Sequence, residues 1–102
     1  MALDFTTIKD EPGTAVFLMH DGSTMGERYM TDLAEDIRRR TKKQIILLDG
    51  SETVGRSVLE FYGLATGRYV LLVRDDDQLH QVWREGDNFD AAQIAYLAEQ
   101  AG

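Results

Sequence analysis

Two short runs of apolar residues constrain the fold of this chain more than any other feature. They are Ala15–His20 and Gln44–Leu48, and each is bounded by residues typical of turns. Each run has the length of one strand and is apolar at consecutive positions, which is typical of a strand buried on both faces. Central strands of parallel sheets have this pattern, so the sequence predicts an α/β protein.

A long helix is predicted between these strands, from Met25 to about Arg40. Thr24 and Glu27 have the spacing of a capping box, in which the hydroxyl accepts from the backbone N–H three residues later and the carboxylate reaches back. The residues that recur at helical spacing, and that predict an apolar stripe, are Tyr29, Met30, Leu33 and Ile37.

A second helix is predicted after the second strand, beginning at Ser51 or Thr53 and ending near Gly63, a residue type that often adopts the left-handed conformation after a helix. Gly55 inside this helix costs up to about 1 kcal/mol relative to alanine, so the helix depends on packing. Its predicted apolar stripe consists of Val54, Val58, Phe61 and Tyr62.

The second half of the chain predicts an antiparallel hairpin and a last helix. Tyr69–Val73 and Leu79–Trp83 are separated only by a short acidic turn, which is too short for a parallel connection. Asp87 or Asn88 is expected to cap the final helix. Ahead of the first strand, a short edge strand is expected from the alternation of Leu3, Phe5 and Ile8.

Composition limits the classes of function. The 102 residues fit one domain, and the formal charge of −7 opposes binding to nucleic acid or to an anionic membrane. No apolar run approaches the length that spans a bilayer, and a cytoplasmic location is expected by default. The chain has no cysteine, which excludes disulfides, thiolate nucleophiles and cysteine-ligated metals.

The order of these elements resembles the thioredoxin family from about Thr14 to Ala98. Val16–Met19 is similar to the family's central strand, and Tyr62–Leu64 followed by Tyr69–Val73 is similar to the segment around the family's cis-proline. The resemblance implies a three-layer α/β/α fold in a single domain, residues 1–102. It also implies a mixed central sheet of about four to five strands with three helices.

Two departures from the family change the implied activity. The four positions of the family's Cys-Gly-Pro-Cys motif fall on Ser23, Thr24, Met25 and Gly26, so thiol-disulfide exchange is lost. The position of the cis-proline falls at about Arg68, and the single proline of the chain is Pro12. In the family that proline borders the active site, so its loss also changes the surface that binds peptides.

The resemblance implies a recognition face made of the loop from His20 to Met25, the loop from Ala65 to Tyr69 and the turn near Gly86. A charged Arg68 in such a loop favours recognition over stability. The candidate binding residues are His20, Ser23, Thr24, Met25, Arg68 and Tyr69.

No catalytic or metal-binding residue is assigned from the sequence. Ser23 lies at a predicted helix start, where capping explains it better than nucleophilic attack, since no oriented base is apparent. His20 and His80 have no spacing that predicts a metal site, and Asp75–Asp77 lacks the ligand pattern of a calcium loop. No cofactor is expected.

The sequence therefore predicts a non-catalytic, adaptor-like or chaperone-like module that binds another protein, as a monomer or weak homodimer. An alternative is a small-anion or glutathione-type ligand binder or enzyme that uses the helix N-terminus at Ser23 together with Arg68. A third possibility is self-association through the predicted edge strand Leu79–Trp83.

Overall fold

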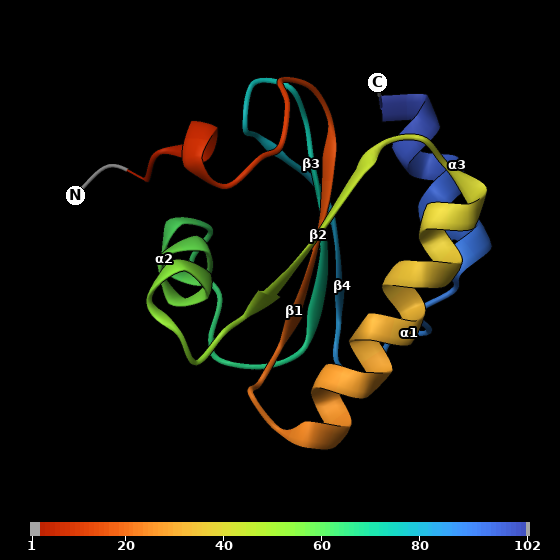
Figure 1. Cartoon of the computed structure of the whole chain (residues 1–102). Coiled ribbons are helices and arrows are strands. Elements are labelled where there is room, and N and C mark those ends of the chain that lie inside the picture. Colours follow the sequence, from red (N-terminus) through yellow and green to blue (C-terminus); the bar gives the residue numbers. More distant parts are fainter. Residues whose placement is uncertain (1–2, 102) are drawn as a thin grey trace.

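The computed structural model describes residues 3–101 and has three α-helices around one sheet (Figure 1). None of the helices within residues 3–101 is both long and apolar enough to cross a bilayer. In chain order the elements are η1 (Phe5–Thr7, a 3-10 helix), β1 (Ala15–His20), α1 (Thr24–Arg40), β2 (Gln44–Asp49), α2 (Thr53–Phe61), β3 (Tyr69–Val73), β4 (Leu79–Arg84) and α3 (Ala91–Ala101).

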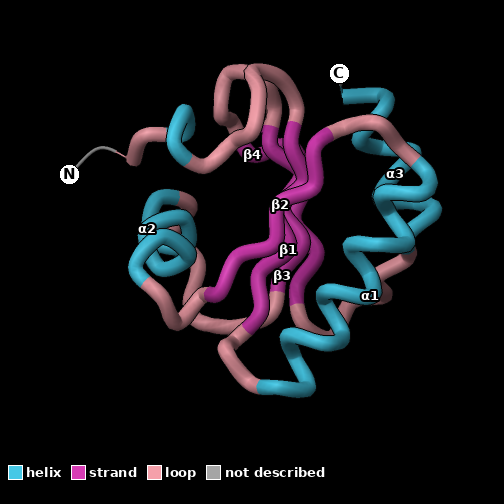
Figure 2. Tube along the Cα trace, viewed as in Figure 1, coloured by secondary structure: helices cyan, strands magenta, loops and turns pink. Residues whose placement is uncertain are grey.

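The four strands form one mixed sheet in the order β2-β1-β3-β4. β1 pairs with β2 in parallel, and β3 runs antiparallel to both β1 and β4. Figure 2 shows the sheet edge-on, with α1 and α3 on one side and α2 on the other. The predicted α/β class, the three-layer arrangement and the mixed sheet are confirmed, and the sheet has four strands.

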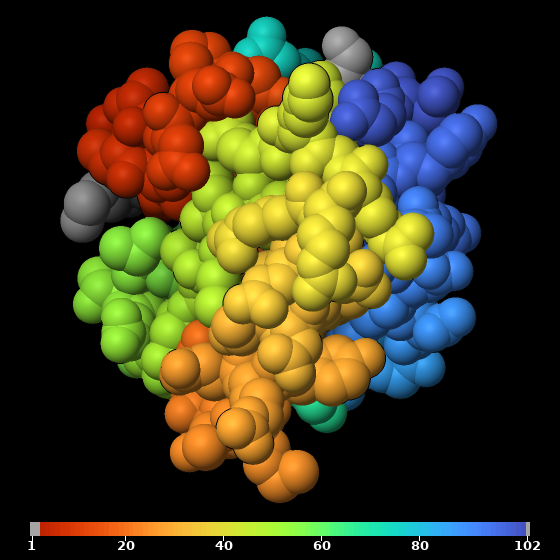
Figure 3. Space-filling view, turned by 45° about the vertical axis from the view of Figure 1, so that its right-hand side comes forward, coloured from red at the N-terminus to blue at the C-terminus, as the bar shows by residue number. Residues whose placement is uncertain are grey.

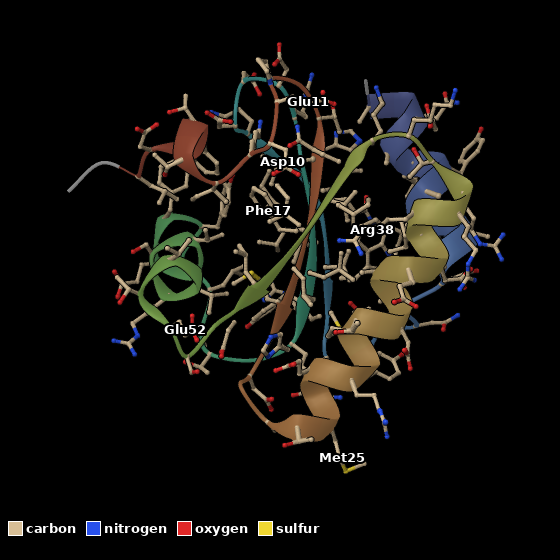
Figure 4. The ribbon with its side chains drawn as sticks, viewed as in Figure 1. Asp10, Glu11, Phe17, Met25, Arg38 and Glu52 are labelled. Atoms are coloured by element: carbon tan, nitrogen blue, oxygen red, sulfur yellow. The ribbon has the colours of Figure 1, made fainter. Side chains whose placement is uncertain are left out.

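β1 separates two hydrophobic cores, and all six of its residues are buried. Val16 and Leu18 pack into the core under α1 and α3, while Phe17 and Met19 pack into the core under α2 and η1 (Figure 4). Successive side chains of a strand point to opposite faces, so a strand that must fill two cores is apolar at every position.

The predicted N-terminal edge strand is wrong, because the segment forms the 3-10 turn η1 instead. The Asp4 carboxylate accepts from the Thr6 N–H at 3.0 Å and stabilises the turn. Phe5 then stacks on Phe17 with ring centroids 6.2 Å apart, which buries Phe5 against the sheet face rather than pairing its backbone with a strand.

Lys9 fixes this N-terminal segment to the turn between β3 and β4, at the end of the sheet where β1 begins. Its ammonium group donates to the carbonyls of Gly13 at 2.9 Å and Arg74 at 3.1 Å and pairs with the Asp77 carboxylate at 2.8 Å. The side chain of Lys9 is almost fully buried, so these three oxygen atoms replace the water that its charge loses. The acidic turn between β3 and β4 is therefore a structural anchor.

The predicted start is confirmed for α2, which begins at Thr53, whereas the capping residues of α1 and α3 differ from those predicted. Ser23, rather than Thr24, caps α1, and Glu52 precedes α2 without a side-chain cap. The Asp90 carboxylate accepts from the Ala92 N–H at 3.0 Å at the start of α3, in place of the predicted Asp87 or Asn88. Asp, Ser and Asn all bond to nearby backbone N–H groups, so composition alone does not choose among neighbouring candidates.

Gly55 of α2 lies against the end of β2, and this close approach generates the first prediction. A Cβ atom at this position would lie 2.1 Å from the carbonyl oxygen of Asp49, which is backbone and cannot rotate away. We expect Gly55→Ala to lower the free energy of unfolding by about 1–3 kcal/mol. Helix propensity alone predicts the opposite sign, a gain of about 1 kcal/mol.

Urea-induced unfolding monitored by circular dichroism measures this difference. Ser57→Ala, in the same helix, is the matched control and should change stability little, since its hydroxyl only bonds back to the Thr53 carbonyl. A stabilised Gly55→Ala protein would contradict the close contact between α2 and β2.

Candidate functional site

Two similar turns lie side by side where the parallel strands β1 and β2 end. Each has the sequence Asp-Gly-Ser, at residues 21–23 and 49–51. In the first, the Asp21 Oδ1 accepts from the Ser23 N–H at 3.0 Å and from its hydroxyl at 2.6 Å. In the second, the Asp49 Oδ1 accepts from the Ser51 N–H at 2.8 Å and from its hydroxyl at 2.7 Å.

Gly22 and His20 join the two turns. Gly22 has a φ of +85°, and a Cβ there would lie 2.8 Å from the Ser51 hydroxyl oxygen, so the turns approach each other closely. His20 is 4% exposed and lies beneath them. Its Nδ1 accepts from the Gly22 N–H at 3.1 Å, and its carbonyl accepts from the Gly50 N–H at 2.8 Å. His20 therefore supports the loops and offers little surface to a partner.

The Ser23 hydroxyl is fully used as the cap of α1. It donates to Asp21 and accepts from the Gly26 N–H at 3.0 Å. The imidazole of His20 makes no hydrogen bond to it among the described contacts, and the Nδ1 of that ring accepts from the Gly22 N–H. A serine without an adjacent base is a weak nucleophile, so the arrangement supports capping and not acyl transfer.

Both turns lower the pKa of their carboxyl groups. The hydrogen bonds from the Ser23 side chain and backbone hold the pKa of Asp21 below its ordinary value, and the nearby charge of Arg68 adds to this effect. The equivalent hydrogen bonds from Ser51 lower the pKa of Asp49. Hydrogen bonds that favour the charged form have this direction of effect. Both turns are therefore anionic at neutral pH.

Arg68 lies in the loop before β3 and is held in place by two residues, Glu85 and Tyr29. Its Nε donates to the Glu85 carboxylate at 2.7 Å, and its Nη2 lies 2.6 Å from the same oxygen. The guanidinium group also lies over the ring of Tyr29 from α1, 6.0 Å from the ring centroid. The side chain is one third exposed, so it is fixed while still reaching solvent.

An exposed apolar area adjoins this arginine. Met25 is 84% exposed at the start of α1, and Tyr29, one turn later, is 48% exposed. Tyr29 packs against Phe89 with ring centroids 6.2 Å apart. Figure 4 shows Met25 pointing away from the body of the molecule at the amino end of α1. We call the group formed by Met25, Tyr29, Arg68, Glu85 and Phe89 the Arg68 surface.

The structure separates the predicted binding residues into two groups. Ser23, Thr24, Met25 and Arg68 reach solvent at this end of the sheet, whereas His20 and Tyr69 are buried. The Tyr69 hydroxyl donates to the Ala65 carbonyl at 2.8 Å and so shapes the loop that carries Arg68.

Sequence reasoning missed three members of the Arg68 surface: Tyr29, Glu85 and Phe89. Tyr29 was assigned to the buried stripe of α1, and this prediction is wrong because about half of its surface is exposed. Its place four residues after Met25 is the available signal, since such residues share one helix face.

Other candidate features have structural partners. Within residues 3–101 no group of three or more histidine or acidic side chains is placed to hold a metal ion. At the far end of α1, Arg39 and Arg40 both pair with the Asp36 carboxylate, at 3.7 Å and 3.2 Å. The five basic residues of the segment 38–43, which would offer a docking patch to an acidic partner, are therefore partly neutralised by an acidic residue of α1.

A comparison with models of known protein families gives no match for this chain, and a comparison with curated protein sequences gives none either. The resemblance to thioredoxins stays a prediction that depends on element order and on short segments.

The two Asp-Gly-Ser turns predict that removing either serine changes the pKa of the aspartate in its own turn only. Ser23 lowers the pKa of Asp21 in the folded protein. The ionised Asp21 therefore stabilises the fold at pH values above the pKa it has in the unfolded chain, and this contribution is lost as the pH falls through its pKa in the folded protein. We expect Ser23→Ala to raise the pKa of Asp21 and leave that of Asp49 nearly unchanged. Ser51→Ala should do the reverse.

Carboxyl chemical shifts followed by NMR between neutral and acidic pH measure both values in each variant. Each variant is the matched control for the other, since the change of side chain and the turn geometry are the same. Equal shifts of both carboxyls in both variants would show that the turns titrate as one unit and would contradict this assignment.

Proposed function

We propose that this protein is a non-catalytic module that binds another protein through the Arg68 surface. The single observation that carries the proposal is an arginine held against an aromatic ring beside an 84% exposed methionine. Methionine, tyrosine and arginine are enriched in the centres of protein interfaces.

The fixed geometry of Arg68 supports binding at low entropic cost. The ion pair with Glu85 and the stacking on Tyr29 already restrict its rotamers in the free protein. A side chain ordered before association loses less entropy on association, which favours affinity. The carboxylates of Asp21 and Glu85 border the surface, so a partner with a basic rim around an apolar centre fits best.

The same carboxylates give the alternative anion-binding function less support. An anion at the N-terminus of α1 would have to displace the Ser23 cap from the Gly26 N–H and approach the charged Asp21. Arg68 already has Glu85 as its counter-ion. The proposed role needs no cofactor and no catalytic residue, and it retains the cytoplasmic location expected from the sequence.

Met25→Glu tests the proposal without disturbing the core. A glutamate in the first turn of a helix is favourable for folding, so stability should be unchanged or slightly raised. We expect the affinity for a partner isolated from a native cell extract to fall roughly tenfold or more, because an apolar anchor becomes a charge. Arg68→Glu should weaken the same interaction.

Arg39→Glu is the matched control, since it makes the same charge change as Arg68→Glu in the last turn of α1, where the side chain is 70% exposed. It should leave the interaction intact. Isothermal titration calorimetry with the purified partner gives the four affinities, for wild type and the three variants. Equal affinity for wild type, Met25→Glu and Arg68→Glu would overturn the proposal.

A further inference from the structure

The two histidines of this chain lie in different surroundings. His80 is exposed on β4, whereas His20 is buried at the end of β1, and its Nδ1 accepts from the Gly22 N–H at 3.1 Å. A ring nitrogen that accepts a hydrogen bond carries no proton, so the neutral ring of His20 has its proton on Nε2. The bond to Gly22 therefore requires the uncharged form of His20.

Protonation of His20 is incompatible with this bond. The charged ring carries N–H on both nitrogens, so two donors then face each other at Nδ1 and Gly22. Histidine is the side chain whose charge ordinarily changes between about pH 5 and pH 8. The Gly50 N–H bonds instead to the backbone carbonyl of His20, at 2.8 Å, and this bond depends on no titrating atom. The same histidine therefore holds one turn through its ring and the other through its backbone.

Two carboxylates lie near the ring and attract it when it is charged. Asp49 stands opposite His20 in the parallel register, so both side chains are on the same face of the sheet. Hydrogen bonds from Ser51 lower the pKa of Asp49, and the nearby charge of His20 lowers it further. Asp21 follows His20 directly, and hydrogen bonds from Ser23 lower its pKa. Both carboxylates are therefore ionised at the pH values where histidine titrates.

The other elements around His20 add one cation, which already has a partner. His20 alternates with Val16 along β1, so its side chain points to the face covered by α1 and α3. The described residues of α1 and α3 that are buried against this face carry no charge. Arg68, ahead of β3, acts on Asp21 but pairs with Glu85 at 2.6 Å. The local charges therefore favour a positive ring, whereas the bond from the Gly22 N–H favours a neutral one.

The loop that His20 holds leads directly into the Arg68 surface. Gly22 is followed by Ser23, the cap of α1, and Met25 lies in the first turn of that helix. Gly22 also lies against Ser51 of the second turn, so movement of Gly22 alters the contact between the two turns. Figure 3 shows the orange atoms of this part of the chain at the surface, at the lower end of the molecule. A change at His20 is therefore presented to a partner through this loop.

We propose that His20 is a pH-sensitive switch: its neutral ring holds the Gly22 N–H, and its protonated ring releases Gly22 and pairs with the Asp49 carboxylate. The proton comes from solvent. Release leaves the start of α1 less ordered, and the added positive charge repels the basic rim of the partner. Both effects weaken binding at acid pH, a consequence that rests on the function proposed above.

Amide hydrogen exchange of the wild-type protein tests the switch without any partner. We expect the protection factor of the Gly22 amide, relative to an unstructured chain at the same pH, to fall roughly tenfold or more as the His20 ring becomes charged. The protection factor of Gly50 should stay constant. NMR spectra that correlate ring protons with ring nitrogens give the charge and tautomer of both histidines at each pH. Constant protection of Gly22, an equal fall for Gly50, or a proton on Nδ1 of the neutral ring would overturn the proposal.

His20→Asn separates the acceptor from the charge. The asparagine side-chain oxygen is two bonds from Cβ, as Nδ1 is, so it accepts from the Gly22 N–H and does not titrate. We expect the protection of Gly22 in this variant to be independent of pH between about pH 5 and pH 8. His80→Asn, the same substitution at the exposed histidine, is the matched control and should keep the wild-type response. If Asp21→Asn abolishes the response, Asp21 is the titrating group and the proposal is wrong. The wild-type exchange decides alone if circular dichroism shows His20→Asn to be unfolded.

Calorimetry at about pH 7.5 and about pH 5.5, with the partner purified as above, tests the consequence for binding. We expect the loss of affinity at the lower pH to be roughly fivefold or more larger for wild type than for His20→Asn. Titrations within the partner itself are the same in both measurements and cancel. An equal loss in the two proteins would show that the switch does not act on the Arg68 surface. Absence of any binding contradicts the proposed function alone, because the exchange of Gly22 is measured without a partner.

Discussion

The burial of β1 on both faces and along both edges is the constraint on which the rest of the structure depends. All six of its residues are buried, and it has a parallel neighbour on one side and an antiparallel neighbour on the other. Because Phe17 and Leu18 point into different cores, α2 and η1 must cover one face while α1 and α3 cover the other. The carboxyl end of this strand then fixes where the loops of the candidate site begin.

The chemistry of that site follows from how those loops end their strands. Aspartate and serine in each Asp-Gly-Ser turn satisfy each other and the local backbone N–H groups. The same bonds that make the turns rigid leave the Ser23 hydroxyl without a free proton and the His20 Nδ1 without a free lone pair. Rigid loops with satisfied polar groups suit recognition better than proton transfer, which needs groups of matched pKa within reach of a substrate.

Sequence reasoning recovered the elements whose signal is local and failed where tertiary contacts decide. The apolar run of β1 predicted a strand buried on both faces, and all six of its residues are buried. The similar run of β2 predicted the same burial, and this prediction is wrong because β2 lies at the edge of the sheet and its last four residues are half-buried. Phe5 alternates with Leu3 and Ile8 like a strand residue, yet stacking on Phe17 outweighs pairing with an edge. Tyr29 has the spacing of a core residue, but Met30 occupies the core, and Tyr29 is half exposed with Arg68 over its ring. Phe17 is distant from Phe5 in the sequence, and Arg68 is distant from Tyr29, so these two contacts were not predictable.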